Sequence, residues 1–214
     1  MLPQPLALFP LHQVLFPGGR LALRIFEPRY LDMIGRCIES GEPFGVVGLT
    51  AGSEVRERLP GSEAFGKELF HATGTLAHLN HWERPQAGLM LVRARGGQRF
   101  HLRESECLKH GLWTGQAELM KDDAAILVPE DLRPLSTLLQ GFLQTLQQGC
   151  EAGDMPLQPP YAWGDCGWLA NRWSELLPLA EHERQHLMAL DNPLLRLELV
   201  ADQLEKLGIK QQER

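Results

Sequence analysis

Two histidines one helical turn apart have the residue types and the spacing that could do chemistry. His182 and His186 flank Glu183 in the pattern H-E-x-x-H, in which both imidazoles bind Zn²⁺ and the glutamate acts as general base. The two x positions hold Arg184 and Gln185, although a zinc helix is normally buried beside its site. No sequence pattern indicates the third protein ligand that a catalytic zinc ion needs. A zinc hydrolase is therefore an open alternative, but we predict no metal, no cofactor and no catalytic residue.

The segment from Gly61 to Glu68 comes close to the phosphate-binding pattern G-x-x-x-x-G-K-[ST]. That pattern ends on a hydroxyl group that binds magnesium, whereas Glu68 would place an anion beside the phosphates. The segment also follows Arg-Leu-Pro instead of a buried strand. We therefore expect a flexible hairpin loop here and no nucleotide site.

A second pair of histidines, His78 and His81, precedes Trp82 and could supply half of a metal site. Side chains alternate between the two faces of a strand, so this spacing places the two imidazoles on opposite faces. No cluster of cysteines or carboxylates accompanies them. We therefore predict no metal ion at this pair.

Arginines gather on both sides of Gly96-Gly97, which we interpret as the turn of a hairpin. The predicted anion-binding patch on its two strands consists of Arg93, Arg95, Arg99, His101 and Arg103. The apolar residues that alternate with them, and that we expect in the core, are Met90, Val92, Ala94, Phe100 and Leu102. An arginine-lined strand face can hold phosphates or an acidic partner. The alternative is a solvated face whose charges pair with Glu104 and Glu106.

The composition limits the classes of protein that the chain can belong to. Its 214 residues include 21 Lys and Arg against 27 Asp and Glu, and the net charge of −6 argues against a general attraction for nucleic acid. A hydrophobic fraction of 43% is enough for a core and excludes intrinsic disorder. No apolar run is long enough for a membrane span, and prolines interrupt the apolar N-terminus, so we expect a cytoplasmic protein. The four cysteines, which we expect to be reduced, are Cys37, Cys107, Cys150 and Cys166.

The elements that must position these residues divide the chain in two. Up to about residue 125, runs punctuated by glycine and proline predict strands at 6–9, 20–26, 44–49, 72–79, 88–94, 98–104 and 113–120. A helix interrupts them, with Glu27 at its cap, Pro28 at its first position and Gly41 at its end. Strands at this spacing favour a small barrel or sandwich.

Residues 126–208 are predicted to form a helical subdomain, and residues 209–214 a polar tail. One face of a helix beginning at Pro134 would carry Leu135, Leu138, Leu139, Phe142 and Leu146. A loop rich in glycine and proline follows at 149–165. Further helices are expected around 169–177, 180–190 and 194–207, the last with Leu197, Val200 and Leu204 facing inward.

Several separate segments carry a family resemblance. The first two are LFPLHQVLFPG at 8–18 and LALRIFEPRY at 21–30, followed by Gly74-Thr75 and Gly97-x-Arg99-Phe100. The later ones are Leu176-Leu-Pro-Leu, His186-Leu-Met and Asp191-Asn-Pro-Leu-Leu-Arg-Leu. In this order they resemble the N-terminal, substrate-binding domain of Lon proteases, and equally the Lon-like domain of cereblon.

The resemblance implies an α+β fold: a PUA-like β pseudo-barrel with one inserted helix at 1–125, followed by a C-terminal α-helical bundle at 126–208. In full-length Lon this region precedes an ATPase module and a Ser–Lys peptidase module. Neither follows here, so we expect a free-standing Lon-domain protein of the small bacterial type. Its implied role is non-catalytic recognition of unfolded or degron-bearing polypeptides, within a protease system.

Recognition of unfolded chains needs an exposed apolar surface with a polar rim. The predicted peptide-binding residues are Phe16, Arg24, Arg29, Tyr30 and Trp82, and further aromatic candidates are Trp113, Tyr161 and Trp163. The alternative is that the aromatic residues pack inside the protein and that Arg29 forms a structural ion pair with Glu27. RNA binding through the arginine face also stays open, because PUA-like barrels occur in RNA-binding proteins.

Overall fold

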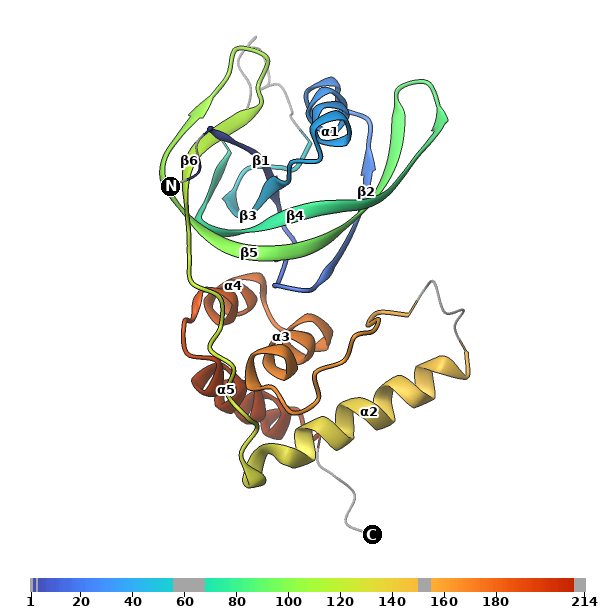
Figure 1. Ribbon diagram of the computed structural model, residues 1–214, viewed down its shortest axis with the longest axis vertical. Helices are drawn as coiled ribbons and strands as arrows, with labels where there is room; N and C mark the ends of the chain where they lie inside the picture. Colours follow the sequence, from blue (N-terminus) through green and yellow to red (C-terminus); the bar gives the residue numbers. More distant parts are fainter. Residues whose placement is uncertain (1, 3, 56–67, 150–154, 210–214) are drawn as a thin grey trace. The chain divides into compact units, whose positions relative to one another are not determined.

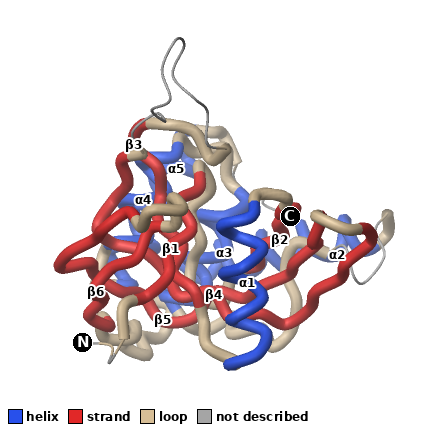
Figure 2. The backbone as a smooth tube through the Cα atoms, turned by 90° about the horizontal axis from the view of Figure 1, so that it is seen from above, coloured by secondary structure: helices blue, strands red, loops and turns tan. Residues whose placement is uncertain are grey.

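The computed structural model describes residues 2, 4–55, 68–149 and 155–209. The chain forms two compact units, Met1–Asp122 and Asp123–Arg214, where the sequence analysis set a boundary near residue 125. Among the described residues, the strands and helix α1 (Pro28–Ser40) lie in the first unit, and the remaining helices lie in the second (Figure 1, Figure 2).

The strands of the first unit form one strongly curved sheet. They are β1 (Leu6–Leu11), β2 (Arg20–Ile25), β3 (Phe44–Ala51), β4 (Leu69–Gln86), β5 (Leu89–Cys107) and β6 (Trp113–Leu119). The sheet order is β2-β5-β4-β3-β1-β6, and β6 also pairs with β5. This second pairing closes β5, β4, β3, β1 and β6 into a ring and leaves β2 at an edge. The predicted α+β fold, a pseudo-barrel followed by helices, is therefore confirmed.

Strand β5 is continuous where the sequence analysis predicted a hairpin at Gly96-Gly97. The turn that joins β4 to β5 lies earlier, at Ala87-Gly88, where Gly88 has a φ of 75°. The two glycines instead mark the point where β5 exchanges one partner for another. Before them it pairs with β2, and after them with β6. Glycine fits this point because the Phe16 carbonyl oxygen approaches so closely that Gly96 has no room for a Cβ.

The sheet buries apolar side chains on both faces. On one face, Met90, Val92 and Ala94 of β5 join a cluster with residues of α1 such as Met33 and Ile34. On the other face, Phe100 and Leu102 belong to a second cluster inside the closed ring, together with Leu8, Val47 and Ala117. The five predicted core residues of β5 are thus buried, but in two separate cores.

Helix α1 has the ends that the sequence predicted. Glu27 stands at its N-cap, Pro28 begins it, and Gly41 ends it in the left-handed conformation with a φ of 73°. Its buried face carries Tyr30, Met33 and Ile34. This face packs on the sheet and determines which sheet face is left for solvent.

The second unit consists of the 3₁₀ helix η1 (Glu130–Leu132) and helices α2 (Arg133–Gln147), α3 (Cys166–Leu176), α4 (Glu181–Ala189) and α5 (Pro193–Lys206). Leu197, Val200 and Leu204 of α5 are buried as predicted. The prediction for α2 is partly wrong, because its buried residues are Leu135, Leu139 and Leu143, and Phe142 is 42% exposed. In the described part of the chain, no helix combines the length and the hydrophobicity that crossing a bilayer requires.

A buried arginine that the sequence analysis did not single out joins the elements of the second unit. The Arg196 side chain is fully buried, and its Nη atoms contact the two carboxylate oxygens of Asp123 at 2.6 and 3.1 Å. Nη1 also donates to Asn171 Oδ1 at 2.9 Å, Nε to Leu187 O at 2.9 Å, and Nη2 to Leu190 O. All five N–H donors of the guanidinium therefore have partners on α3, on and after α4, and on the segment after β6.

We expect Gly96→Ala to destabilise the first unit by about 3 kcal/mol, because the new methyl group must displace the backbone at Phe16. Native-state hydrogen exchange of the β2 and β5 amides measures this loss. Gly97→Ala is the matched control. Its methyl group would meet the exposed His78 ring, at 2.5 Å from Nε2, and that ring can move aside; Leu76 Cβ, at 3.6 Å, is in ordinary contact. Equal effects of the two substitutions would contradict the close approach at Gly96.

We expect Arg196→Met to destabilise the second unit by about 3–5 kcal/mol, because it leaves Asp123 and Asn171 without their buried partner. Hydrogen exchange should then lose protection in α3 and α5 and keep it in β5. The control is Arg133→Met, whose side chain is 66% exposed in a surface pair with Glu130 and should change stability little. Full protection of α3 in the Arg196 variant would refute this anchoring role.

Burial raises the pKa of Glu175 to about 7, against the opposing effect of Arg172 at 3.0 Å. The unfolded chain releases this proton near the model-peptide value, so the folded state binds more protons between about pH 4.5 and 7. Stability from this group is therefore present at low pH and lost as pH rises through 7. The free energy of unfolding of Glu175→Gln should exceed that of the parent by about 2 kcal/mol at neutral pH, and the two should differ little near pH 4.5. Thermal unfolding at both pH values measures the difference, and a pH-independent difference would contradict the shift.

Candidate functional site

Strand β2 has a free edge, since among the described residues it pairs with β5 alone. Its register follows from the bond that the Gly96 N–H donates to Gly19 O at 2.8 Å. Bonded and non-bonded pairs alternate in an antiparallel ladder, so Arg20, Ala22 and Arg24 stand in non-bonded pairs with β5. Their peptide N–H and C=O groups therefore point away from β5, toward the free edge.

A hollow of about 230 Å³ borders this edge between β2 and β1. Phe9 and Leu11 of β1 line one side, and residues 22–25 of β2 with the following Phe26 line the other. Glu27 and Glu54 also line it, but Arg29 contacts Glu27 at 3.1 Å, and Glu54 accepts a bond from the His12 N–H at 2.6 Å. We call this the edge hollow. Apolar and polar side chains both line it, and its carboxylates already have partners.

The sheet face turned away from α1 carries arginines and histidines in three rows across β2, β5 and β4. The first row is Arg20, Arg95 and His78, the second Ala22, Arg93 and His81, and the third Arg24, Leu91 and Glu83. We call these nine positions the cationic face. A second hollow, of about 320 Å³, lies on it and shares Ala22, Leu23 and Arg24 with the edge hollow. Arg24, predicted as a peptide contact, and Arg93 and Arg95, predicted as an anion patch, therefore belong to one surface.

The cationic face places like charges directly opposite each other. Arg20 is paired with Arg95, and the non-bonded positions of an antiparallel ladder bring side chains closest. Among the nine positions the one carboxylate is Glu83, and it contacts His81 Nε2 at 2.8 Å. Arginines and histidines therefore outnumber carboxylates on this face.

Large apolar side chains are exposed at the same place. Phe26, just after β2, is 53% exposed, and Leu91, opposite Arg24, is 38% exposed. Trp82 is 45% exposed as predicted for a contact residue, but it pairs with Val92 and so lies on the sheet face opposite Arg93. The sequence analysis missed Phe26 because it counted that residue as the last of a strand. Phe26 lies directly before Glu27-Pro28, where the strand must end, and this position could have indicated that its side chain lies outside the sheet.

Three of the predicted peptide-binding residues are buried and form part of the core. Phe16 is fully buried, and Tyr30, stacked on Phe9 with ring centroids 3.8 Å apart, is 2% exposed, which raises the pKa of its hydroxyl. Arg29 contacts Glu27 at 3.1 Å, Glu68 at 2.9 Å and the Gly111 carbonyl at 2.8 Å. These side chains therefore offer no surface to a peptide, and the predicted Glu27–Arg29 ion pair is present.

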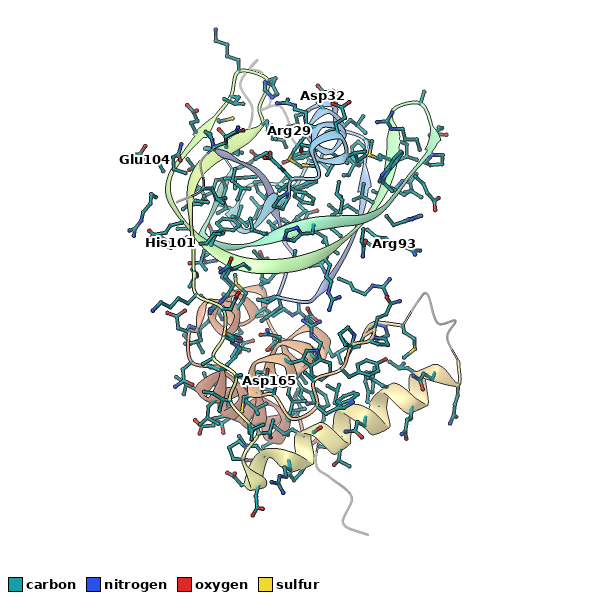
Figure 3. All side chains as sticks on the ribbon, viewed as in Figure 1. Arg29, Asp32, Arg93, His101, Glu104 and Asp165 are labelled. Atoms are coloured by element: carbon teal, nitrogen blue, oxygen red, sulfur yellow. The ribbon has the colours of Figure 1, made fainter. Side chains whose placement is uncertain are left out.

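The predicted arginine patch is divided between two sheet faces. One extra residue in β5 between the pairs Ala77–Gly96 and Thr75–Arg99 reverses the alternation. Arg99 consequently lies on the face opposite Arg95 and is 3% exposed. Arg103 pairs with Glu118 of β6 at 2.5 Å. Figure 3 shows His101 far along the sheet from Arg93, so Arg99, His101 and Arg103 do not extend the cationic face.

A similar irregularity corrects the prediction for His78 and His81. A bulge in β4 between Leu79 and His81 brings both histidines opposite outward residues of β5, Arg95 and Arg93. They therefore share one face, beside arginines that repel a cation. In the described part of the chain, no three His, Cys, Asp or Glu side chains group as metal ligands would.

The H-E-x-x-H motif lies on α4 with its histidines outward. His182 and His186 are exposed, and Gln185 between them is buried. The Glu183 carboxylate accepts a bond from the Ala180 N–H at 2.8 Å, so it acts as a helix cap. The motif residues therefore have structural roles on this helix.

The segment from Gly61 to Lys67 lies outside the described residues. Glu68, the residue that departs from the phosphate-loop pattern, is 6% exposed and contacts Arg29. Its second oxygen accepts a bond from Trp113 Nε1 at 2.5 Å. Glu68 is therefore a buried residue of the first unit that pairs with Arg29 and Trp113.

The remaining aromatic candidates contact one another or the core. The Trp113 ring packs edge-on against Phe70 with centroids 5.1 Å apart. Tyr161 and Trp163 form a half-buried cluster with Trp168 in the second unit, with centroids 4.9 to 6.1 Å apart. These aromatic rings therefore pack against other rings of the protein.

Comparison with known proteins decides the family. The family of the ATP-dependent protease La (LON) substrate-binding domain matches residues 5–206. The chain belongs to this family. A Lon N-terminal domain protein from Xanthomonas campestris has 29% sequence identity and a TM-score of 0.71, over 93% of this chain and 98% of that one. No curated protein sequence gives a match.

The Lon fold is also found in a more distant structure. The N-terminal domain of Mycobacterium avium complex Lon protease matches with a TM-score of 0.59 and 14% identity, over 94% of this chain and 98% of that one. The β2 surface described above thus lies on a domain of the Lon substrate-binding family.

Proposed function

We propose that this Lon domain binds segments of unfolded or degron-bearing polypeptide at the surface around β2, without catalysing a reaction, and serves a protease system. The proposal rests on the free edge of β2. This edge separates two hollows, and both hollows are lined by Ala22, Leu23 and Arg24. A folded protein rarely leaves a strand edge, a hollow and large exposed apolar side chains such as Phe26 and Leu91 together without a partner.

The chemistry of the surface suits a polypeptide. Unfolded chains present apolar side chains and unpaired peptide groups. Phe26 and Leu91 offer apolar contact, and the peptide groups of Ala22 and Arg24 offer hydrogen bonds. Arg24 and Arg93 add a polar rim that can fix the orientation of a bound segment.

RNA binding through the same arginines is the competing interpretation. The cationic face supplies positive charge, but nucleic acid recognition also calls for aromatic side chains that stack on bases. Trp82 lies on the opposite sheet face from Arg93, and Phe26 beside β2 is a single exposed ring where stacking of successive bases calls for several. The net charge of −6 further opposes attraction of RNA.

The first test is fluorescence anisotropy of a labelled, permanently unfolded protein titrated with the full chain. We expect saturable binding that Phe26→Ser and Arg24→Glu each weaken by about tenfold, because each removes a contact at the β2 surface. The matched controls are Phe142→Ser on α2 and Arg36→Glu on α1, which change exposed residues on other elements and should leave the affinity unchanged.

Addition of RNA to the same titration separates the two interpretations. Polypeptide binding that survives an excess of RNA supports the proposal. Absence of binding, or displacement by RNA that depends strongly on salt, contradicts it. Equal losses in the control variants would place the binding surface elsewhere on the chain.

A further inference from the structure

We infer that the second unit carries a polypeptide-binding site of its own, beside Leu127 and Trp163, and that this site prefers segments in which an apolar side chain stands next to lysine or arginine. The inference goes beyond the proposed function, which concerns β2 of the first unit only. It follows from an exposed leucine on a fixed backbone, from the hollow beside it and from the charge of the second unit.

Leu127 has the largest exposed fraction, 83%, among the large apolar side chains in the described part of the chain. Its backbone is nevertheless fixed, because the segment 126–128 pairs with 164–166 through two backbone hydrogen bonds of 2.9 Å. Neighbouring side chains of an extended segment point to opposite sides, and here Val128 is buried while Leu127 points outward. Leu127 is therefore an apolar side chain that an ordered backbone presents to solvent.

A hollow of about 410 Å³ lies next to Leu127, and we call it the α2 hollow. Its lining is mostly apolar, and Leu127 and Trp163 provide its largest apolar side chains. Ser136 and Thr137 of α2 also line it and add two hydroxyl groups. The α2 hollow can therefore take a large apolar side chain of a bound segment.

Trp163 is held in position by two other aromatic rings. The centroid of its ring lies 4.9 Å from the ring centroids of both Tyr161 and Trp168, and the side chain is half-buried. An ammonium or guanidinium group is attracted to the face of an aromatic ring, and tryptophan attracts it most strongly. An apolar hollow beside an indole ring thus suits a segment that combines apolar and basic side chains.

The charge of the second unit favours the same partner. Residues 123–214 contain 14 Asp and Glu and 7 Lys and Arg, a net charge of −7, whereas residues 1–122 contain 13 and 14, a net charge of +1. Two of the seven basic residues, Arg172 and Arg196, are buried in ion pairs. The second unit therefore attracts positive charge more strongly than the net charge of the whole chain indicates.

The charges at the start of α2 agree with this preference. Arg133 is the basic residue in the lining of the α2 hollow, and Glu130 contacts it at 3.3 Å. Asp131, between these two residues in the chain, is exposed. Carboxylates therefore outnumber basic groups here, so lysine or arginine beside the apolar anchor of a segment is attracted and glutamate is repelled.

The same charges disfavour a second copy of this site as the occupant, because two acidic units repel each other. A foreign segment with lysine or arginine turns this repulsion into attraction. We therefore assign the α2 hollow to a basic and apolar segment of a partner polypeptide.

Fluorescence anisotropy of labelled peptides, titrated with the full chain, tests the inference. The probe is a peptide of leucines flanked by lysines, and two matched peptides replace either its lysines by glutamate or its leucines by serine. We expect the probe to bind at least about tenfold more tightly than either matched peptide, because the site requires both the charge and the apolar group. Added salt should weaken this binding without abolishing it, since salt screens only the charged part.

Leu127→Ser locates the binding site on the chain. We expect it to weaken probe binding about tenfold and to leave thermal stability unchanged, because the side chain is exposed. The matched control is Leu195→Ser on α5 of the same unit, which also changes an exposed leucine and should keep the affinity of the parent.

Two substitutions at Thr137 test the charge preference. This residue is exposed, lines the α2 hollow and lies on a helix that both glutamate and lysine favour. We expect Thr137→Glu to tighten probe binding severalfold and Thr137→Lys to weaken it severalfold. A folding defect would not shift the affinity in opposite directions.

The outcomes separate this inference from the proposed function. Phe26→Ser, at the β2 surface, should leave the affinity for the probe unchanged, and a loss there would place the probe at β2 and overturn the inference. Equal binding of the three peptides, equal effects of the two leucine substitutions, or equal effects of the two Thr137 substitutions also overturns it and leaves the proposed function standing. Self-association of the chain that Leu127→Ser abolishes would assign the α2 hollow to a second copy and overturn it as well.

Discussion

The continuity of β5 through Gly96-Gly97 is the constraint on which the first unit depends. Because the strand does not turn back there, its first half pairs with β2 and its second half pairs with β6. The ring closes through β6 and β1, so β2 keeps one partner and one free edge. The close approach of the Phe16 carbonyl to Gly96 holds the loop that leads into β2 against this crossing point. The open edge is thus a consequence of how the barrel closes.

An open edge is also a liability, since it can pair with another copy of the same chain. Charged side chains beside an edge are one way in which a sheet avoids such pairing, and Arg24, Arg93 and Arg95 lie beside this edge. Phe26 and Leu91 are large apolar side chains that are exposed at the same place, and in our proposal they contact the bound polypeptide.

Buried arginines have a different role from these exposed ones. Arg29 joins the start of α1 to Glu68 and to the loop at Gly111, and Arg196 joins the helices of the second unit through Asp123 and Asn171. Removal of either charge would deprive Glu68 or Asp123 of its arginine partner. Since their donors are already used, these arginines stabilise the units and are not available to a ligand.

The sequence by itself determined the elements with strong local signals. Alternation and turn residues located most strands, the pair Pro28 and Gly41 located the ends of α1, and the ordered segments from Leu8 to Leu197 identified the family. These features depend on residues close together in the chain, so no knowledge of distant contacts is needed to find them. For the same reason, Arg24 and Trp82 could be selected as exposed side chains on strands.

Only the tertiary structure decided which of these side chains share a surface. A single extra residue in β5 turned Arg99 away from Arg95, and one in β4 brought His78 and His81 together. Sequence periodicity cannot show such bulges, because they arise from pairing with a strand whose partner and register are set elsewhere. Burial of Phe16 and Tyr30, and the meeting of Arg24 with Arg93, depend on the same long-range pairing. The chain therefore encodes its elements locally, but its candidate binding surface exists only once β5 has joined β2, β4 and β6.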